Sequence, residues 1–230
     1  MLASPGAVED VVLGKGGIAE GSAAGSTLVE MSTIGPESVH ELRSRLPAEV
    51  DMLDAPVLGS VPQAERGELK VFVGGEPGTV ERAMAVLETL GTVRHMGSLG
   101  AGASMKLVAN STLLALMTGL GEALTLADGL GLRQNDVLDI LADSAIGVPV
   151  RSKRRFIESG TYPANFKLGL ASKDGSLVMR AAEAAGLDLR LARAAVSWLA
   201  AADHAGLGDL DYSAVVAQIR GTPAALPSGG

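Results

Sequence analysis

The sequence of 230 residues predicts an α/β protein in two parts, an α/β first part and an all-helical second part. Up to residue 96, short apolar stretches alternate with helical segments of about ten residues, which is typical of βα units and a mostly parallel sheet. After Gly97 no further strand pattern appears. We expect strands at residues 26–31, 49–54, 69–73 and 92–96, and helices at 6–13, 37–46, 78–90, 106–127, 135–143, 150–158, 168–185, 191–204 and 212–219.

Composition and charge narrow the class of function. Apolar residues make up 47% of the chain and charged residues 20%, as in a globular protein with a core, and aromatic residues only 3%. The net charge of -7, with no basic run, argues against nucleic acid and anionic membrane partners. The absence of cysteine excludes disulfides and thiolate chemistry. His40, His95 and His204 stand far apart, so we expect no metal site.

The ends of the chain carry separate expectations. The first ten residues lack the basic and apolar regions of a signal peptide, and the longest apolar stretch, residues 113–120, is too short to span a membrane. We therefore expect a soluble, cytoplasmic protein. The last residues, 222–230, are rich in Gly, Pro and Ser and are predicted to be disordered.

The segment after Gly97 holds a candidate site. It continues without proline and with few charges, and its apolar residues cover most of the helix circumference, which predicts burial in a core or between subunits. Lys106 and Asn110 interrupt it four residues apart, so both lie on one face. Lys106 either extends its ammonium to water or is a half-buried acid/base at the mouth of a cleft. In the second case Asn110, one turn later, can hold the lysine or the substrate oxygen.

Two further pairs allow more than one interpretation. Ser32 and Thr33 follow the strand at 26–31, where open α/β sheets bind ligands, but either hydroxyl could cap the next helix instead. Lys173 falls on the apolar face of the helix at 168–185, so its ammonium must end near a partner or a cleft. Asp174 is then its partner or a charge favoured by the helix dipole, and a solvated pair is the commoner arrangement.

Four blocks in order resemble the β-hydroxyacid dehydrogenase family, which includes 3-hydroxyisobutyrate dehydrogenase, tartronate semialdehyde reductase and glyoxylate/succinic semialdehyde reductases. Each block alone is a weak signal, whereas the ordered set is specific and spans nearly the whole chain. The blocks are Met31-Ser32-Thr33-Ile34, then Asp54-Ala55-Pro56-Val57 with Gly59, then Gly97-x-x-Gly100-x-Gly102-x-x-x-Lys106-x-x-x-Asn110, and last Asn165-Phe166 through Lys173-Asp174.

The resemblance implies an incomplete Rossmann-type NAD(P)-binding domain at residues 1–96. An all-helical, 6-phosphogluconate-dehydrogenase-like C-terminal domain at 97–221 would bind substrate and form a homodimer or homotetramer. The implied reaction is hydride transfer with NADP or NAD between a small β-hydroxyacid and its semialdehyde or keto form. The implied roles are general acid/base for Lys106, support of the reacting oxygen or of the lysine for Asn110, cofactor contacts for Leu2, Ser32, Thr33, Lys173 and Asp174, and substrate contacts for Leu58, Gly59 and Ser60.

Two features depart from the family pattern. Leu58 replaces a serine that in the family helps to hold the substrate carboxylate, so the identity of the substrate stays open. The G-x-G-x-x-G turn that seats the pyrophosphate is not in the sequence, so about two βα units are expected to be missing. A misassigned start, a fragment or a natural truncation would each account for this, and we favour the first because Lys106, Asn110 and Lys173 remain. The alternative function is that of a non-catalytic truncated homologue that acts only as a dimerising structural or interaction protein.

Overall fold

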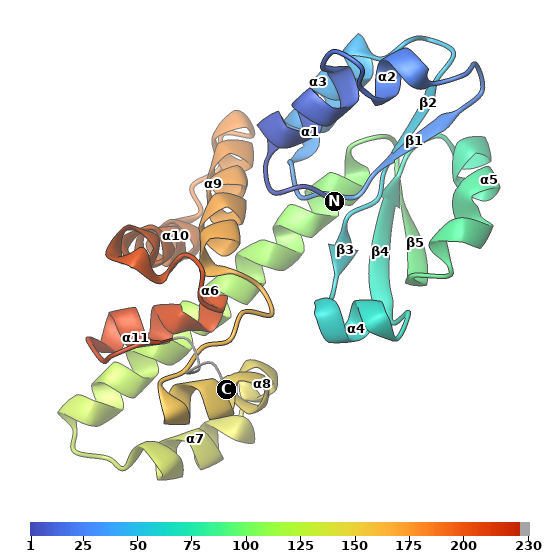
Figure 1. Ribbon diagram of the computed structural model, residues 1–230. Helices are drawn as coiled ribbons and strands as arrows, with labels where there is room; N and C mark the ends of the chain where they lie inside the picture. Colours follow the sequence, from blue (N-terminus) through green and yellow to red (C-terminus); the bar gives the residue numbers. More distant parts are fainter. Residues whose placement is uncertain (226–230) are drawn as a thin grey trace. The chain divides into compact units, whose positions relative to one another are not determined.

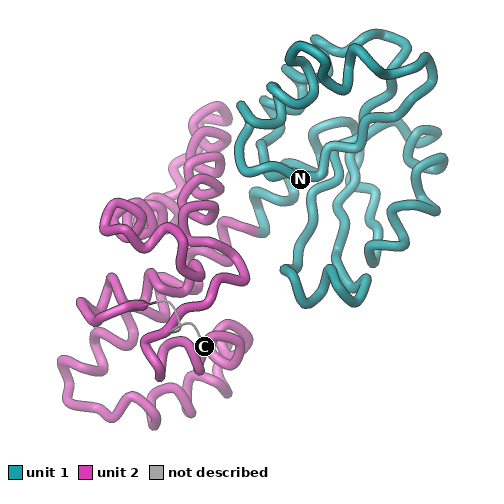
Figure 2. Tube along the Cα trace, viewed as in Figure 1, with its two compact units in different colours: residues 1–109 teal, residues 110–230 magenta. Residues whose placement is uncertain are grey.

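The computed structural model describes residues 1–225, and the chain divides into two compact units, residues 1–109 and 110–230 (Figure 2). The sequence placed the boundary before Gly97, but the units divide inside helix α6 (Ala101–Gly129). The reason is that the first turn of α6 is bonded to the sheet of the first unit. The carboxylate of Asp54, at the end of a strand, accepts the N–H groups of Gly100 at 2.7 Å and Ala103 at 2.6 Å.

The first unit contains a sheet that is less parallel than expected. Its strands are β1 (Thr27–Glu30), β2 (Asp51–Asp54), β3 (Val57–Leu58), β4 (Leu69–Gly74) and β5 (Gly91–Gly97). β1 pairs with β2 and β4 with β5 in parallel, but β4 runs antiparallel to β2 and β3. The chain returns from β2 to β4 through β3 and the short helix α4 (Val61–Glu65), without the crossover helix that a parallel pairing needs.

Helices cover both faces of this sheet. Besides α4, the first unit contains the helices α1 (Pro5–Leu13), α2 (Ile18–Gly21), α3 (Pro36–Arg45) and α5 (Pro77–Leu87) (Figure 1). Met52 packs with the apolar residues of α1 and α3, whereas the next residue, Leu53, packs with those of α5. Successive side chains of a strand point to opposite faces, so β2 joins two separate cores. The sequence predicted α1, α3 and α5, but not α2 or α4.

The second unit is helical, as predicted. It contains the rest of α6 with α7 (Gln134–Ala142), α8 (Gly147–Ser159), α9 (Leu168–Ala184), α10 (Arg190–Ala202), the kinked turn η1 (Asp203–Leu207), the 3-10 turn η2 (Tyr212–Ala214) and α11 (Val215–Arg220). Its core joins Leu120 of α6, Leu168 of α9, Leu199 of α10 and Val216 of α11. Between residues 98 and 225, β pairing is limited to isolated bridges at Thr161–Ala225 and Lys167–Asp211.

Helix α6 buries one side and exposes the other within this chain. Leu114, Met117 and Leu124 are buried, whereas Val108 and Leu126 are exposed. Helix α6 is long and apolar enough to cross a membrane. These two properties are weak evidence for a membrane span, because core helices of soluble proteins share them.

Side chains also tie the helices of the second unit to α6. Trp198 of α10, which is the single tryptophan of the chain, donates its indole N–H to Glu122 of α6 at 3.0 Å. Arg220 of α11 forms two hydrogen bonds with Asp128 of α6, at 2.9 and 3.0 Å. These contacts fasten α10 and α11 to α6.

The expectation of a disordered tail at 222–230 is wrong for its first part. Ala225 donates its N–H to the carbonyl of Gly160 at 3.1 Å, and its own carbonyl accepts the N–H of Tyr162 at 2.9 Å. These backbone bonds hold residues 222–225 against the segment that follows α8. The rest of the predicted tail, residues 226–230, lies outside the described residues.

Candidate active site

Ser32 is buried at the carboxyl end of β1 and is bonded on two sides. Its hydroxyl accepts the N–H of Leu2 at 2.8 Å, and its own N–H donates to Oε1 of Glu30 at 2.7 Å. Helix α3 begins at Pro36 with Gly35 as its N-cap and has no side-chain cap in the described part of the chain. The hydroxyl of Ser32 therefore binds the backbone of Leu2 in place of capping α3.

Glu30 is a candidate cofactor-binding residue that the sequence analysis missed. Its side chain is buried, and its Oε2 atom has no hydrogen-bond partner among residues 1–225. Burial raises the pKa of Glu30, and the hydrogen bonds from Ser32 only partly oppose this shift. The available signal was a charged residue at the last position of a strand that is otherwise apolar or β-branched.

Asp54 fixes the start of the helix that carries Lys106. It is fully buried, and each of its oxygens accepts one N–H from the first turn of α6. A Cβ on Gly102 would lie 2.2 Å from the carbonyl oxygen of Phe72, so only glycine allows this close approach of helix and strand. The sequence block Asp54-Ala55-Pro56-Val57 was assigned to the substrate loop, and this helix-anchoring role was not foreseen. Lys106 follows one turn after Gly102 and is half-buried.

The predicted substrate loop is ordered by its own contacts. Leu58 ends β3 half-buried, and Gly59 has a φ of 134°, a conformation that favours glycine. Ser60 donates both its N–H, at 3.0 Å, and its hydroxyl, at 3.1 Å, to Oε1 of Gln63. Ser60 thus caps α4 in this structure, and its donors are occupied by Gln63.

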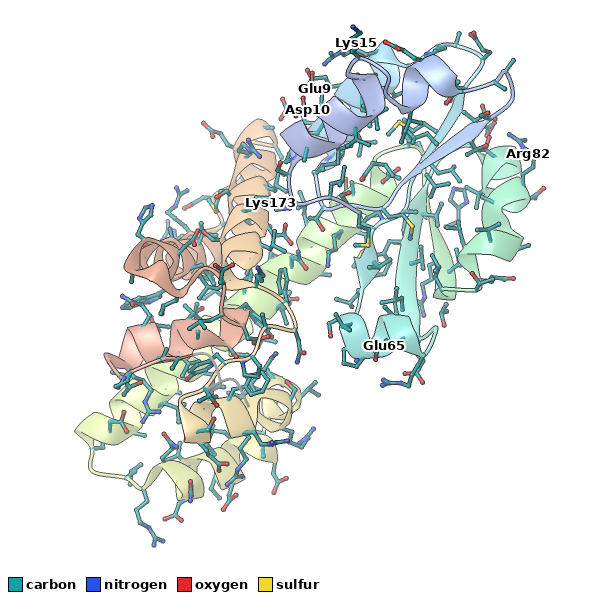
Figure 3. All side chains as sticks on the ribbon, in the orientation of Figure 1. Glu9, Asp10, Lys15, Glu65, Arg82 and Lys173 are labelled. Atoms are coloured by element: carbon teal, nitrogen blue, oxygen red, sulfur yellow. The ribbon has the colours of Figure 1, made fainter. Side chains whose placement is uncertain are left out.

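A buried polar chain links α6 to α9 in the second unit. Asn110 is fully buried, and its Nδ2 donates to Oδ2 of Asp174 at 2.6 Å. The other oxygen of Asp174 lies 2.7 Å from Nζ of Lys173, which is partly exposed on α9 (Figure 3). Oδ1 of Asn110 has no hydrogen-bond partner within residues 1–225. Asp174 is therefore a buried partner of Asn110, and the Lys173–Asp174 pair is not the solvated pair that its spacing favoured.

The structure thus brings two groups of predicted site residues together. Leu2 is bonded to Ser32 in the first unit, and Asn110, Lys173 and Asp174 are joined in the second. Lys106 lies on the same helix as Asn110, one turn earlier, as the spacing predicted.

Comparison with known proteins shows which family the chain belongs to. Residues 1–100 match the family model described as the NAD binding domain of 6-phosphogluconate dehydrogenase. Residues 100–219 match the model described as NAD-binding of NADP-dependent 3-hydroxyisobutyrate dehydrogenase. Glyoxylate/succinic semialdehyde reductase 1 of Arabidopsis thaliana is 31% identical over 96% of this chain and 77% of its own length. The chain belongs to the β-hydroxyacid dehydrogenase family.

Further relatives of this β-hydroxyacid dehydrogenase agree in sequence and fold. The 2-(hydroxymethyl)glutarate dehydrogenase of Eubacterium barkeri is 33% identical over 94% of this chain and 73% of its own length. The crystal structure of 3-hydroxyisobutyrate dehydrogenase from Salmonella typhimurium superimposes with a TM-score of 0.82 at 26% identity, over 94% of this chain and 76% of that one. The chain is an oxidoreductase of this family, and its cofactor is NAD or NADP.

The residues present fit part of a nicotinamide nucleotide. A ribose offers hydroxyl groups that need acceptors, and Oε2 of Glu30, at the end of β1, has no hydrogen-bond partner among residues 1–225, whereas its Oε1 accepts the N–H of Ser32. The ends of parallel strands in open α/β sheets are ligand sites.

Proposed function

We propose that this chain catalyses reversible hydride transfer between NAD(P) and a small β-hydroxyacid, with Lys106 as general acid and base. The observation that carries the proposal is the chain of contacts Asn110–Asp174–Lys173, in which Oδ1 of Asn110 is buried and has no hydrogen-bond partner in the described part of the chain. A buried polar atom without a partner costs free energy, and such an atom is usually matched by a ligand or by water.

Each polar side chain takes a distinct part. When bound, the nicotinamide ring gives or receives the hydride at the carbon that bears the oxygen. Lys106 donates a proton to that oxygen in the direction of reduction and removes it in the direction of oxidation. Nδ2 of Asn110 donates to Asp174. Its Oδ1 would then accept a hydrogen bond from the substrate hydroxyl or from the Lys106 ammonium.

The substrate class follows from the names of the relatives. Semialdehydes and hydroxyacids that these proteins are named for are small carboxylates, and we propose the same class for this chain. The carboxylate would lie at the loop of Leu58, Gly59 and Ser60. Leu58 offers it no hydroxyl, and Ser60 can donate only after it releases Gln63.

Binding and turnover test the proposal in order. We expect NADPH or NADH to bind the chain in a fluorescence titration, and small semialdehydes to be reduced. Lys106→Met should lower kcat by about 10²–10⁴-fold with cofactor binding intact, because it removes the acid/base. Lys15→Met, at an exposed lysine of the first unit, is the matched control.

Two results would count against the proposal. Turnover of Lys106→Met within about tenfold of the parent chain would remove Lys106 from the acid/base role. The absence of binding even at millimolar cofactor would favour the alternative, a dimerising protein without catalysis.

A further inference from the structure

Asp211 is fully buried, and both of its carboxylate oxygens are saturated. Oδ2 accepts the N–H groups of Asn165 at 3.1 Å and Phe166 at 3.3 Å. Oδ1 accepts the N–H and the hydroxyl of Ser213, at 3.1 and 2.6 Å. Nζ of Lys153 lies 2.8 Å from the same oxygen. The sequence analysis assigned no role to Asp211 or Lys153.

Lys153 of α8 reaches Asp211 through an aromatic enclosure. Its Nζ lies 5.1 Å from the ring centroid of Phe156 and 5.0 Å from that of Tyr212, distances at which cation–π attraction acts. The ring of Phe166 packs on that of Tyr212 with 5.5 Å between centroids. A buried ion pair often stabilises a protein no more than apolar residues of the same size would. Net stability alone therefore gives little reason for this pair.

The segment that Asp211 holds leads directly into α9. Phe166 accepts the N–H of Tyr212 at 2.8 Å, and Leu168, the first residue of α9, donates to the carbonyl of Leu210 at 2.8 Å. The N-cap of α9, Lys167, makes no side-chain capping bond. The start of α9 is thus defined by its bonds to the segment around Asp211.

We propose that Asp211 is a positioning residue, neutralised by Lys153, that fixes where α9 begins and so aligns Asp174 with Asn110. A shift by one residue would rotate a helical side chain by about 100° and move it about 1.5 Å along the axis. The 2.6 Å bond between Asn110 and Asp174 would not survive such a shift. The consequence for catalysis, though not the positioning itself, rests on the proposed function.

Amide hydrogen exchange of the full chain tests the positioning directly. Asp211→Asn keeps the size of the side chain but replaces one acceptor oxygen by an NH2 group. We expect exchange at Asn165 and Phe166 to rise by roughly 10- to 100-fold, because hydrogen bonds to a charged acceptor are lost. The matched control is Asp209→Asn, two positions before Asp211, which removes an exposed carboxylate that pairs with Lys167. It should leave the exchange rates of both amides unchanged.

Steady-state kinetics test the consequence. At a temperature at which both variants are fully folded, kcat should fall at least about tenfold in Asp211→Asn, since loss of register removes support from an acid/base step, and should be unchanged in Asp209→Asn. A merely structural role would lower the melting temperature and leave the kcat of folded molecules intact.

Every outcome decides the proposal. Unchanged exchange in Asp211→Asn overturns the positioning role, and faster exchange with an unchanged kcat overturns its consequence for catalysis. If Asp211→Asn does not fold, Lys153→Met takes its place, because it leaves the buried carboxylate of Asp211 without its cation. We expect this variant, too, to show faster exchange at Asn165 and Phe166 and a lower kcat. No change in either quantity overturns the proposal. If the parent chain transfers no hydride, the proposed function fails, but the exchange data still decide whether Asp211 positions α9.

Discussion

Glu30 is a carboxylic acid buried at the end of β1, and its stability contribution depends on pH. Burial raises its pKa in the folded chain above the ordinary value of a glutamate side chain. The folded state therefore binds the proton more tightly than the unfolded state does. The contribution is fully present below the unfolded-state pKa and is lost as the pH rises through the folded-state pKa.

The substitution Glu30→Gln should remove the loss of stability that the parent chain shows as the pH rises. We expect the melting temperature of the variant, relative to the parent chain, to increase as the pH rises from 4 to 7. Thermal unfolding at several pH values measures the difference, and Glu65→Gln, at an exposed carboxylate on α4, is the control. Parallel curves for Glu30→Gln and the parent would show that burial does not perturb Glu30.

For single residues, the sequence could predict some side-chain contacts and not others. Lys106 and Asn110 were placed on one face because helical spacing alone determines it. The contact between Asn110 and Asp174 joins residues 64 positions apart, and it depends on how α6 packs against α9. Asp211 was missed for the same reason, because its donors at Asn165 and Phe166 lie 46 and 45 positions away.

Helix α6 contains two glycines whose replacement should have opposite effects. A Cβ at Gly102 would collide with the backbone of Phe72, whereas nothing lies within 4 Å of a Cβ at Gly119. We expect Gly102→Ala to destabilise the chain by about 1–3 kcal/mol through overpacking. Gly119→Ala should stabilise it by about 0.5–1 kcal/mol, because alanine loses less backbone entropy in a helix.

Denaturant unfolding of the two variants measures these shifts. The pair shares the same substitution and the same helix, so helix propensity is matched and only the surroundings differ. Equal stabilities of Gly102→Ala and Gly119→Ala would mean that the first turn of α6 does not pack as closely on β4 as described.

The same local rules explain which elements the sequence predicted. Helices α1, α3 and α5 each have proline in the first turn, and their apolar spacing is regular. The two-residue strand β3 and the short α4 are too short to show a period, so they were missed. The antiparallel direction of β4 depends on its pairing with β2 and β3, and strand periodicity carries no information about direction.

Five large apolar side chains of the second unit are exposed at the end of α6, in the connection that follows it, on α7 and on α8. Figure 1 shows these helices next to one another. They are Leu126, Leu130, Leu132, Ile140 and Val148. Extended exposed apolar surface is typical of association sites. We therefore expect a homodimer or homotetramer in solution.

Sedimentation analysis tests this expectation. Leu130→Glu combined with Ile140→Glu should shift the chain toward the monomer, because burying the added charges in an interface is unfavourable. Val86→Glu, at an exposed valine on α5 of the first unit, should leave the assembly unchanged. A monomeric parent chain at tens of micromolar would contradict the expectation.

The position of Trp198 has an optical consequence. The only indole of the chain lies in the second unit, between α10 and α6, so intrinsic fluorescence reports on that unit and is silent about the first. Circular dichroism, in contrast, sums the helices of both. Superimposed melting curves from the two signals would therefore indicate that the units unfold together. Separate curves would resolve the nucleotide-binding unit from the helical one without any introduced label.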